Sequence, residues 1–258
     1  MKIIAEIGSN HCGDLDRAIE HIRVAKRMGA DMVKFQAWNA DEFVSVIRNK
    51  EMYETCKKYQ VPVAWYKKLS DEGNVFFSVF DKKTLNILER TTDSKIYKIA
   101  SGDFTNKELI DAVIKTGKEM FISDGGTTKK EQEEVAGYLR SHKVDYKLFY
   151  CNACYPPDST YLLNLHDRYY EGFSDHSDSL ITSVMAFVME VKYYEKHFKT
   201  WDNESPDSPI SISLWELNRI KTNVDEASKH LKFTERPSEE EKKVIPLIRR
   251  GHDGKRPQ

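Results

Sequence analysis

The chain has 258 residues, of which 40% are hydrophobic and 31% charged, and its formal net charge is −1. This length is typical of a single (β/α)8 barrel, and the near-zero charge gives no general attraction to nucleic acid or to an anionic membrane. No apolar run approaches the roughly 18–20 residues that a membrane-spanning helix needs. Four cysteines are too few for a disulfide framework, and Glu6 lies where a signal peptide would be apolar, so we expect a cytoplasmic protein.

Strand and helix patterns alternate along the chain. Most short apolar strands are followed by a segment whose apolar residues recur with helical spacing. The predicted strands are 3–7, 31–36, 75–80, 95–101, 119–123, 146–151, 171–177 and 191–198. Residues 38–72 form a long, aromatic and mostly helical insertion after the second strand, which is a candidate lid or partner surface. Residues 105–108 (Thr-Asn-Lys-Glu) and 128–131 (Thr-Lys-Lys-Glu) have the form of capping boxes and predict two helix starts.

The repeated alternation predicts a parallel sheet closed into a (β/α)8 TIM barrel. An open, doubly wound sheet is the alternative. The turn after the first strand, residues 7–13, lacks the GxGxxG fingerprint of dinucleotide-binding sheets, which favours the barrel. We assign residues 1–232 to this barrel domain and the charged, proline-containing residues 233–258 to a linker-like tail.

Histidines and oxygen-bearing side chains end the last two predicted strands. Side chains alternate faces along a strand, so Ser174 shares a face with His176, and Glu195 shares a face with His197. If these strands are parallel neighbours, two imidazoles, a carboxylate and a hydroxyl converge, and such ligands suit a divalent ion. The alternative is a pair of strand-end histidines, each hydrogen-bonded to backbone. The Cys-x-x-Cys spacing at 151–154 has no second cysteine pair and is interpreted as incidental.

Several charged and polar residues fall on the strand face that would line a barrel interior. They are Glu6, Lys34, Gln36, Lys98, Ser174, His176, Glu195 and His197. Lysine is rarely buried without a partner, because desolvating its charge is costly. Two inward lysines, with hydroxyls of Ser78, Ser101 and Ser123 at neighbouring strand ends, favour a site for a multiply charged anion such as a phosphorylated carboxylate. The alternative is two internal salt bridges, Lys34 with Glu6 and Lys98 with Glu195.

These residues lie in phrases that resemble the sialic acid synthase family, the N-acetylneuraminate and related nonulosonate synthases. The similarity runs from residue 2 to about residue 250. The matching phrases are residues 4–11 (Ile-Ala-Glu-Ile-Gly-Ser-Asn-His), 29–36 (Gly-Ala-Asp-Met-Val-Lys-Phe-Gln), 98–103 (Lys-Ile-Ala-Ser-Gly-Asp), 172–176 (Gly-Phe-Ser-Asp-His) and 195–198 (Glu-Lys-His-Phe).

The resemblance implies a metal-dependent TIM barrel that condenses phosphoenolpyruvate with an N-acylated aldose such as N-acetylmannosamine. The products would be a nine-carbon 2-keto sugar acid and phosphate. Carried over by position, it implies that phosphoenolpyruvate is held by Lys34, Ser78, Lys98, Ser101, Ser123 and Ser174, and Mn²⁺ or Mg²⁺ by His176 and His197. It places the acceptor sugar at Glu6, Gln36, Tyr155 and Asp207, and gives catalytic roles to Glu195, Glu6 and Lys98, with Glu195 as acid/base.

Departures from the family pattern concern mainly the acceptor side. Ala153 stands where the family commonly has Asn or Ser, the proline that usually follows the Ser78 position is missing, and the loop before Asp207 is one residue short. Full-length family members continue into a small antifreeze-like domain, and we expect this chain to lack it. The resemblance thus implies a kept donor and metal site, an altered acceptor site, and a homodimer or a separate cap-domain subunit as the partners to consider.

Two other functions remain open from the sequence. A related 2-keto-3-deoxy sugar-acid synthase would act on a phosphorylated aldose, which requires an additional basic cluster that the sequence does not point to. A non-catalytic barrel could instead serve as the partner of a separate enzyme subunit. The full set of charged residues that the chemistry needs favours the enzyme.

Overall fold

Eight parallel strands close into a barrel in the computed structural model, which describes residues 1–157, 165, 170–231 and 236–256. Each strand pairs with its sequence neighbours, and the first pairs with the last, in the order β1-β2-β3-β4-β5-β6-β7-β8. The predicted (β/α)8 barrel is confirmed, and the open sheet is wrong. The strands are β1 Lys2–Glu6, β2 Met32–Ala37, β3 Val75–Val79, β4 Ile96–Ile99, β5 Glu119–Ser123, β6 Tyr146–Cys151, β7 Gly172–Asp175 and β8 Tyr193–His197.

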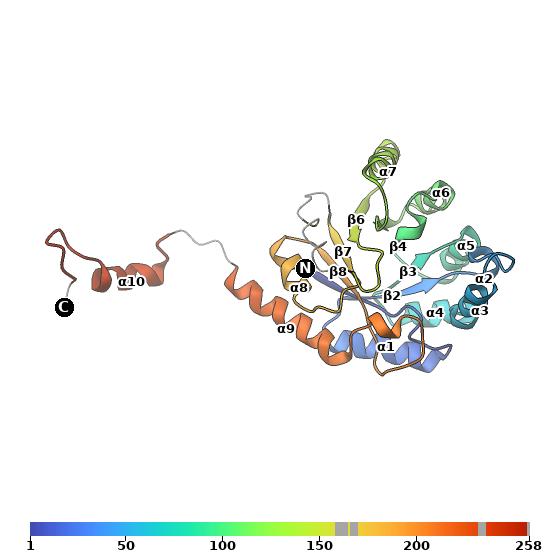
Figure 1. Ribbon diagram of the computed structural model, residues 1–258, viewed down its shortest axis with the longest axis horizontal. Coiled ribbons are helices and arrows are strands. Elements are labelled where there is room, and N and C mark those ends of the chain that lie inside the picture. Colours follow the sequence, from blue (N-terminus) through green and yellow to red (C-terminus); the bar gives the residue numbers. More distant parts are fainter. Residues whose placement is uncertain (158–164, 166–169, 232–235, 257–258) are drawn as a thin grey trace. The chain divides into compact units, whose positions relative to one another are not determined.

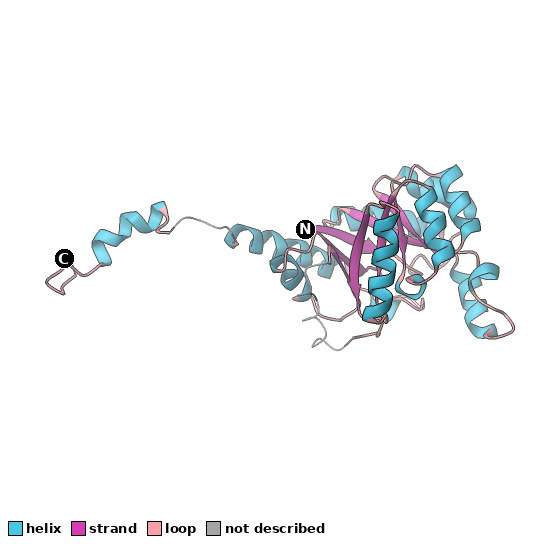
Figure 2. Ribbon diagram, turned by 90° about the horizontal axis from the view of Figure 1, so that it is seen from above, coloured by secondary structure: helices cyan, strands magenta, loops and turns pink. Residues whose placement is uncertain are grey.

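Helices surround the strands and bury the outward strand face (Figures 1 and 2). The predicted insertion between β2 and β3 is helical, as expected. The helices up to β8 are α1 Leu15–Arg27, α2 Ala40–Phe43, α3 Lys50–Tyr59, α4 Val63–Asp71, α5 Lys82–Thr91, α6 Lys107–Lys115, α7 Lys129–Ser141 and α8 Thr182–Val188, with short 3-10 turns η1 Ser101–Asp103 and, after β8, η3 Ser208–Ile210. After β8 also follows α9 Leu214–His230, whose residues up to 224 belong to the same compact unit as the barrel.

One of the two predicted capping boxes forms. At the start of α7 the Thr128 side chain accepts from the Glu131 amide, and the Glu131 carboxylate accepts from the Thr128 amide. The box predicted at 105–108 is wrong, because α6 is capped by Asn106, whose side chain accepts from the Leu109 amide. Asn106 competes successfully because asparagine is as good an N-cap as threonine or better, and starting the helix one residue later leaves its carboxamide at the capping position.

The barrel interior has an apolar floor beneath a polar layer. The floor consists of Ile4, Phe76, Phe121 and Phe149, with Met32, Ile96 and Tyr193 packed against it. Each of these residues lies two positions before a polar or sulfur-bearing residue on the same strand face. The alternation that predicted the inward residues is therefore followed, and the site is built directly on a packed aromatic base.

The chain divides into two compact units, 1–224 and 225–258. The predicted domain limit at 232 lies outside the described residues. In the second unit, α10 (Glu239–Ile248) begins with a capping box between Ser238 and Glu241, and its described side chains are mostly exposed. None of the helices in the described ranges is long and apolar enough to cross a membrane.

His21 fastens α1 to the end of β8. Its Nδ1 donates to the Arg17 carbonyl at 2.7 Å, its Nε2 accepts from the Thr200 amide at 3.3 Å, and its ring packs on Trp201 with centroids 4.6 Å apart. Burial lowers the pKa of His21 to about 4; the Arg17 carbonyl opposes this shift and the Arg17 charge adds to it. The folded protein therefore keeps this imidazole neutral where the unfolded chain already takes up a proton.

We expect His21 to make the folded state acid-sensitive below the pKa of an unfolded histidine, about 6.5. Between that value and about 4 the unfolded chain binds one more proton than the folded protein, so the free energy of unfolding decreases as the pH is lowered. At about pH 5 the decrease from its neutral-pH value is about 2 kcal/mol. Denaturant unfolding near pH 7 and near pH 5 measures the loss. His21→Phe is expected to show a loss smaller by that amount, whereas the exposed His142→Phe is expected to behave as wild type; equal losses in all three would contradict the prediction.

Candidate active site

Four charged side chains form one network on the aromatic floor. Glu6, Lys34, Lys98 and Glu195 are each at most 5% exposed. Lys34 Nζ lies 2.8 Å from Glu6 Oε2 and 3.6 Å from Glu195 Oε1, and Lys98 Nζ lies 2.8 Å from both oxygens of Glu195. Both salt bridges weighed from the sequence are therefore present, and Glu195 interacts with both lysines.

Hydroxyl groups complete the surroundings of the lysines. Lys34 Nζ donates to Ser78 Oγ at 2.8 Å, and Lys98 Nζ donates to Ser174 Oγ at 2.6 Å. Ser174 Oγ in turn lies 3.2 Å from Ser123 Oγ. The two ammonium groups thus lie among neutral hydroxyls at the carboxyl ends of β3, β5 and β7, the barrel end where enzymes of this fold place their active sites.

Two further predicted residues border this network. Gln36 Nε2 donates to Glu6 Oε1 at 2.8 Å, so it joins the network through the carboxylate. Ser101 lies just beyond β4 in η1, not in the strand as predicted, and its Oγ accepts from the Gly125 amide at 3.0 Å. That bond turns the Ser101 hydroxyl toward the end of β5. A β-carbon on Gly125 would lie 2.8 Å from Ser101 Oγ, so the close approach depends on glycine.

Burial and opposite charges shift the pKa values within the network. Burial alone would raise the pKa of Glu195, but Lys34 and Lys98 overcome it and lower that pKa to about 2. Burial lowers the pKa of Lys98, and the Glu195 carboxylate only partly opposes the shift. The pKa of Lys34 is raised instead, because Glu195 and Glu6 together outweigh its burial. At neutral pH Glu195 is therefore an ionised carboxylate with no proton of its own to donate.

Two imidazoles lie above the charged network. His176 directly follows β7, outside the strand predicted to contain it, and His197 ends β8; their ring centroids are 5.5 Å apart. His176 Nδ1 lies 3.1 Å from the Asn152 carbonyl and 3.7 Å from Cys151 Sγ. Burial, then the neighbouring His197, lowers the pKa of His176 to about 4. His176 is therefore neutral near pH 7, the form in which imidazole binds metals.

His197 differs from His176 in its hydrogen bonding. Its Nδ1 is buried and has no hydrogen-bond partner among the described residues; Asp207 Oδ1 lies 3.9 Å away. The alternative of two histidines bonded to backbone thus fits His176 but not Nδ1 of His197. No group of three or more His, Cys, Asp or Glu in the described ranges is arranged to hold a metal ion. The residues present fit a divalent ion held by two imidazoles, with substrate or water as its other ligands.

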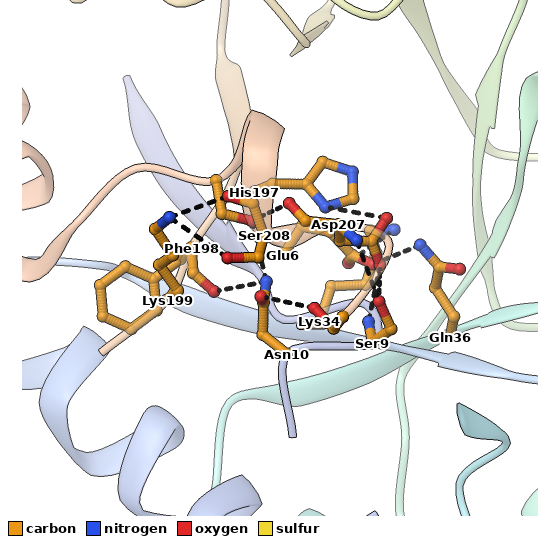
Figure 3. Close-up of polar contacts among 12 residues, drawn as sticks. Glu6, Ser9, Asn10, Lys34, Gln36, His197, Phe198, Lys199, Asp207 and Ser208 are labelled. Carbon is orange, nitrogen blue, oxygen red and sulfur yellow. Dashed lines mark hydrogen bonds and ion pairs between the residues drawn. The ribbon is translucent and has the colours of Figure 1, made fainter. Parts of the chain in front are cut away.

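Tyr155 and Asp207 lie at the rim of the site. The Tyr155 side chain is 59% exposed, and its ring centroid is 4.4 Å from that of His176. Asp207 Oδ2 accepts from the amide and hydroxyl of Ser9 at 2.6 and 2.7 Å (Figure 3). The other oxygen of this carboxylate, Oδ1, therefore faces the His197 ring. Exposure increases from the buried lysines to this rim, so a substrate entering here meets Tyr155 and Asp207 before the charged network. Glu6, another predicted acceptor residue, is itself part of that network.

Asn10 fixes this arrangement, and the sequence did not single it out. Its Nδ2 donates to the Phe198 carbonyl at 3.2 Å (Figure 3). The same Nδ2 donates to Ser211 Oγ at 2.8 Å, and Oδ1 accepts from Asn203 and Ser205. The fully buried carboxamide thus ties the loop after β1 to the loop that carries Asp207. The matching phrase at residues 4–11 contained this residue, but nothing in the pattern distinguishes an asparagine with four long-range hydrogen bonds from an ordinary turn asparagine.

The chain is similar to known proteins in sequence and in fold. Residues 21–236 match the NeuB family model. The chain is 28% identical to the pseudaminic acid synthase of Campylobacter jejuni, covering 89% of this chain and 74% of that protein. It is also 28% identical to the N,N'-diacetyllegionaminic acid synthase of the same species, covering 96% and 83%.

A solved structure extends the similarity to three dimensions. The N-acetylneuraminic acid synthetase of Leptospira borgpetersenii, crystallised in complex with citrate, superposes with a TM-score of 0.85 at 28% identity and covers 94% of this chain and 89% of that one. The family match spans well over half of the chain and includes β2 to β8. The chain therefore belongs to the NeuB family.

Proposed function

We propose that this enzyme condenses phosphoenolpyruvate with an N-acylated aldose and releases phosphate and a nine-carbon 2-keto sugar acid. The observation that carries the proposal is the pair of buried lysines, each bonded to a serine hydroxyl at the carboxyl end of the barrel. A structural ion pair needs no such hydroxyls. A donor carrying both phosphate and carboxylate uses them, because hydroxyls and ammonium groups together bind several anionic oxygens.

Lys34 and Lys98 would bind the donor with Ser78, Ser101, Ser123 and Ser174 around it. Both lysines already face carboxylates, so the donor must share their protons with Glu6 and Glu195. The cluster is formally neutral before binding, and this argues for a further positive charge in the working site. His176 and His197 would hold it as a Mn²⁺ or Mg²⁺ ion, which would polarise the acceptor aldehyde when bound.

The reaction forms a carbon–carbon bond and a bond from a water oxygen to carbon 2, and it breaks the bond between carbon 2 and the phosphate oxygen. Carbon 3 of the enol attacks the aldehyde carbon, and water adds to the cationic carbon 2 that results. The ionised Glu195 would stabilise that cation and pass a proton from the water to the former aldehyde oxygen, which becomes a hydroxyl. Lys34 and Lys98 then stabilise the phosphate as it leaves carbon 2 of the tetrahedral adduct.

The acceptor would extend from the rim, at Tyr155 and Asp207, inward to Gln36 and the buried Glu6. Similarity to a pseudaminic acid synthase and to a diacetyllegionaminic acid synthase supports an amino-sugar acceptor of this general kind. The departures at Ala153 and in the loop before Asp207 support a choice of sugar other than N-acetylmannosamine. We further propose that the enzyme works in the cytoplasm, as a homodimer or with a separate cap-domain subunit.

The proposal is tested by phosphate release from phosphoenolpyruvate with Mn²⁺ present, across aldoses that include N-acetylmannosamine and diacetamido-trideoxyhexoses. We expect release with one sugar and a loss of at least about 100-fold in the His176→Ala protein. Donor binding without release by any sugar would favour a barrel that needs a partner subunit. Absence of both donor binding and turnover would overturn the proposal.

A further inference from the structure

A second buried ion pair lies on the outward face of the strands that carry the two histidines. Asp175 and Lys196 are register partners on β7 and β8, their charged atoms are 2.7 Å apart, and they are 1% and 2% exposed. Because side chains alternate faces, this pair points away from the active site. Yet each member directly precedes one of the histidines, His176 or His197.

The pair holds the backbone on the far side of His176. Asp175 Oδ1 accepts from the Ser177 amide at 2.8 Å, and Lys196 Nζ donates to the Ser177 carbonyl at 2.6 Å. Both polar backbone groups of Ser177 are thus bonded to the ion pair. His176 therefore lies between two residues whose positions the pair fixes: Asp175, which belongs to the pair, and Ser177, whose amide and carbonyl are both bonded to it.

Two hydroxyls complete the bonding of the carboxylate. Tyr194 and Thr182 each donate to Asp175 Oδ2 at 2.6 Å, in addition to Lys196. Tyr194 belongs to β8 and Thr182 begins α8, so β7, β8 and the helix between them meet at one carboxylate. Removing the Tyr194 hydroxyl would loosen the carboxylate without leaving an unpaired charge.

A buried ion pair is weak evidence of stabilisation, because desolvating two charges offsets most of their attraction. Apolar residues at these positions would pack the same interface between the sheet and its helices. They would not bond the amide and carbonyl of Ser177, and they would leave the backbone around His176 free to shift. The charged pair therefore contributes more to fixing the backbone around His176 than to the free energy of unfolding.

We propose that Asp175, Lys196 and Tyr194 are positioning residues that set the separation of His176 and His197, and with it the affinity for a divalent cation. The effect on cation affinity rests on the proposed function, in which these imidazoles hold the ion. The effect on the separation of the two rings does not, because it concerns only where the His176 ring lies relative to His197.

The test compares Tyr194→Phe with a matched variant, Tyr97→Phe. Tyr97 is also fully buried on an outward strand face, and its hydroxyl also donates to a carboxylate, Glu89, at 2.6 Å. Both variants lose one hydroxyl–carboxylate bond, so denaturant unfolding is expected to show similar losses. Calorimetric titration with MnCl₂ is expected to show about threefold to tenfold weaker binding for Tyr194→Phe and wild-type binding for Tyr97→Phe.

Imidazole ¹H–¹⁵N spectra without metal provide the second readout. We expect the His176 signals to shift in Tyr194→Phe and to stay in place in Tyr97→Phe. If the two variants leave the His176 signals equally unchanged, the positioning role is overturned, whatever the metal does. If wild type binds no Mn²⁺ while the His176 signals shift, the metal part of the proposed function fails and the positioning role stands.

A double variant, Asp175→Asn with Lys196→Met, removes both charges together and so avoids burying a lone one. If it folds, we expect Mn²⁺ binding weakened by about tenfold or more. Wild-type metal affinity in a folded double variant would overturn the role of the ion pair in binding. If it does not fold, Tyr194→Phe decides the question alone.

Discussion

Lys98→Met is expected to reduce kcat/KM for phosphoenolpyruvate by about 1,000-fold or more and to weaken donor binding strongly. The substitution removes one of the two buried cations and leaves Glu195 with Lys34 at 3.6 Å as its remaining charged neighbour. Breaking a buried pair by removing one partner costs about 3–5 kcal/mol, so the free energy of unfolding is expected to fall as well. Phosphate release and calorimetric donor titration measure the functional loss, and denaturant unfolding measures the structural one.

The double variant Lys98→Met with Glu195→Gln separates the two effects. It removes both charges of the pair, so we expect much of the lost stability to return. Turnover is not expected to return, since the cation that stabilises departing phosphate and the proton-accepting carboxylate are both gone. Recovery of turnover with stability would mean that the pair serves only the fold, which is the salt-bridge alternative that the sequence left open.

The strand pattern was sufficient to predict which side chains line the barrel. Met32, Lys34 and Gln36 share a face because side chains alternate with period two, and no tertiary contact can change that parity within a regular strand. The closed barrel follows from the same regularity, since strands and helices alternate along most of the chain.

The irregular parts of the site could not be predicted in the same way. Ser101 and His176 lie just past the ends of β4 and β7, where the hydrogen bonds of the sheet stop and alternation no longer fixes direction. Their positions depend on bonds to residues distant in sequence, Gly125 for Ser101 and Asn152 for His176. The four bonds of Asn10 likewise join loops about 190 residues apart, and local patterns carry no information about such pairs.

Which lysine contacts which carboxylate in the charged network could be determined only from the structure. The sequence offered Lys34 with Glu6 and Lys98 with Glu195 as separate salt bridges, and both form. It did not predict that Lys34 also approaches Glu195 at 3.6 Å. This third contact follows from the way a closed barrel brings residues of β2, β4 and β8 to one axis. It adds Glu195 to Glu6 in raising the pKa of Lys34, whereas burial and the charge of Lys34 lower the pKa of Lys98.

Gly8→Ala is expected to impair use of the acceptor far more than binding of the donor. Gly8 has φ +52°, and a β-carbon there would lie 2.2 Å from Asp207 Oδ2 and 3.3 Å from His197 Nδ1. Alanine therefore forces Asp207 away from the Ser9 bonds that fix it. Because the lysines are not displaced, we expect donor affinity within about twofold of wild type and acceptor kcat/KM lower by about 10-fold to 100-fold.

Gly13→Ala is the matched control in the same loop. Gly13 also has a positive φ, +74°, but a β-carbon there meets only the Lys58 carbonyl oxygen, at 3.8 Å. Both variants bear the cost of a left-handed backbone, about 1–2 kcal/mol, whereas only Gly8→Ala displaces the Asp207 carboxylate. Steady-state kinetics with each substrate varied separately, beside denaturant unfolding, distinguishes the two. Equal acceptor kinetics in both variants would show that the position of Asp207 does not control the sugar, and would leave acceptor recognition to Glu6, Gln36 and Tyr155.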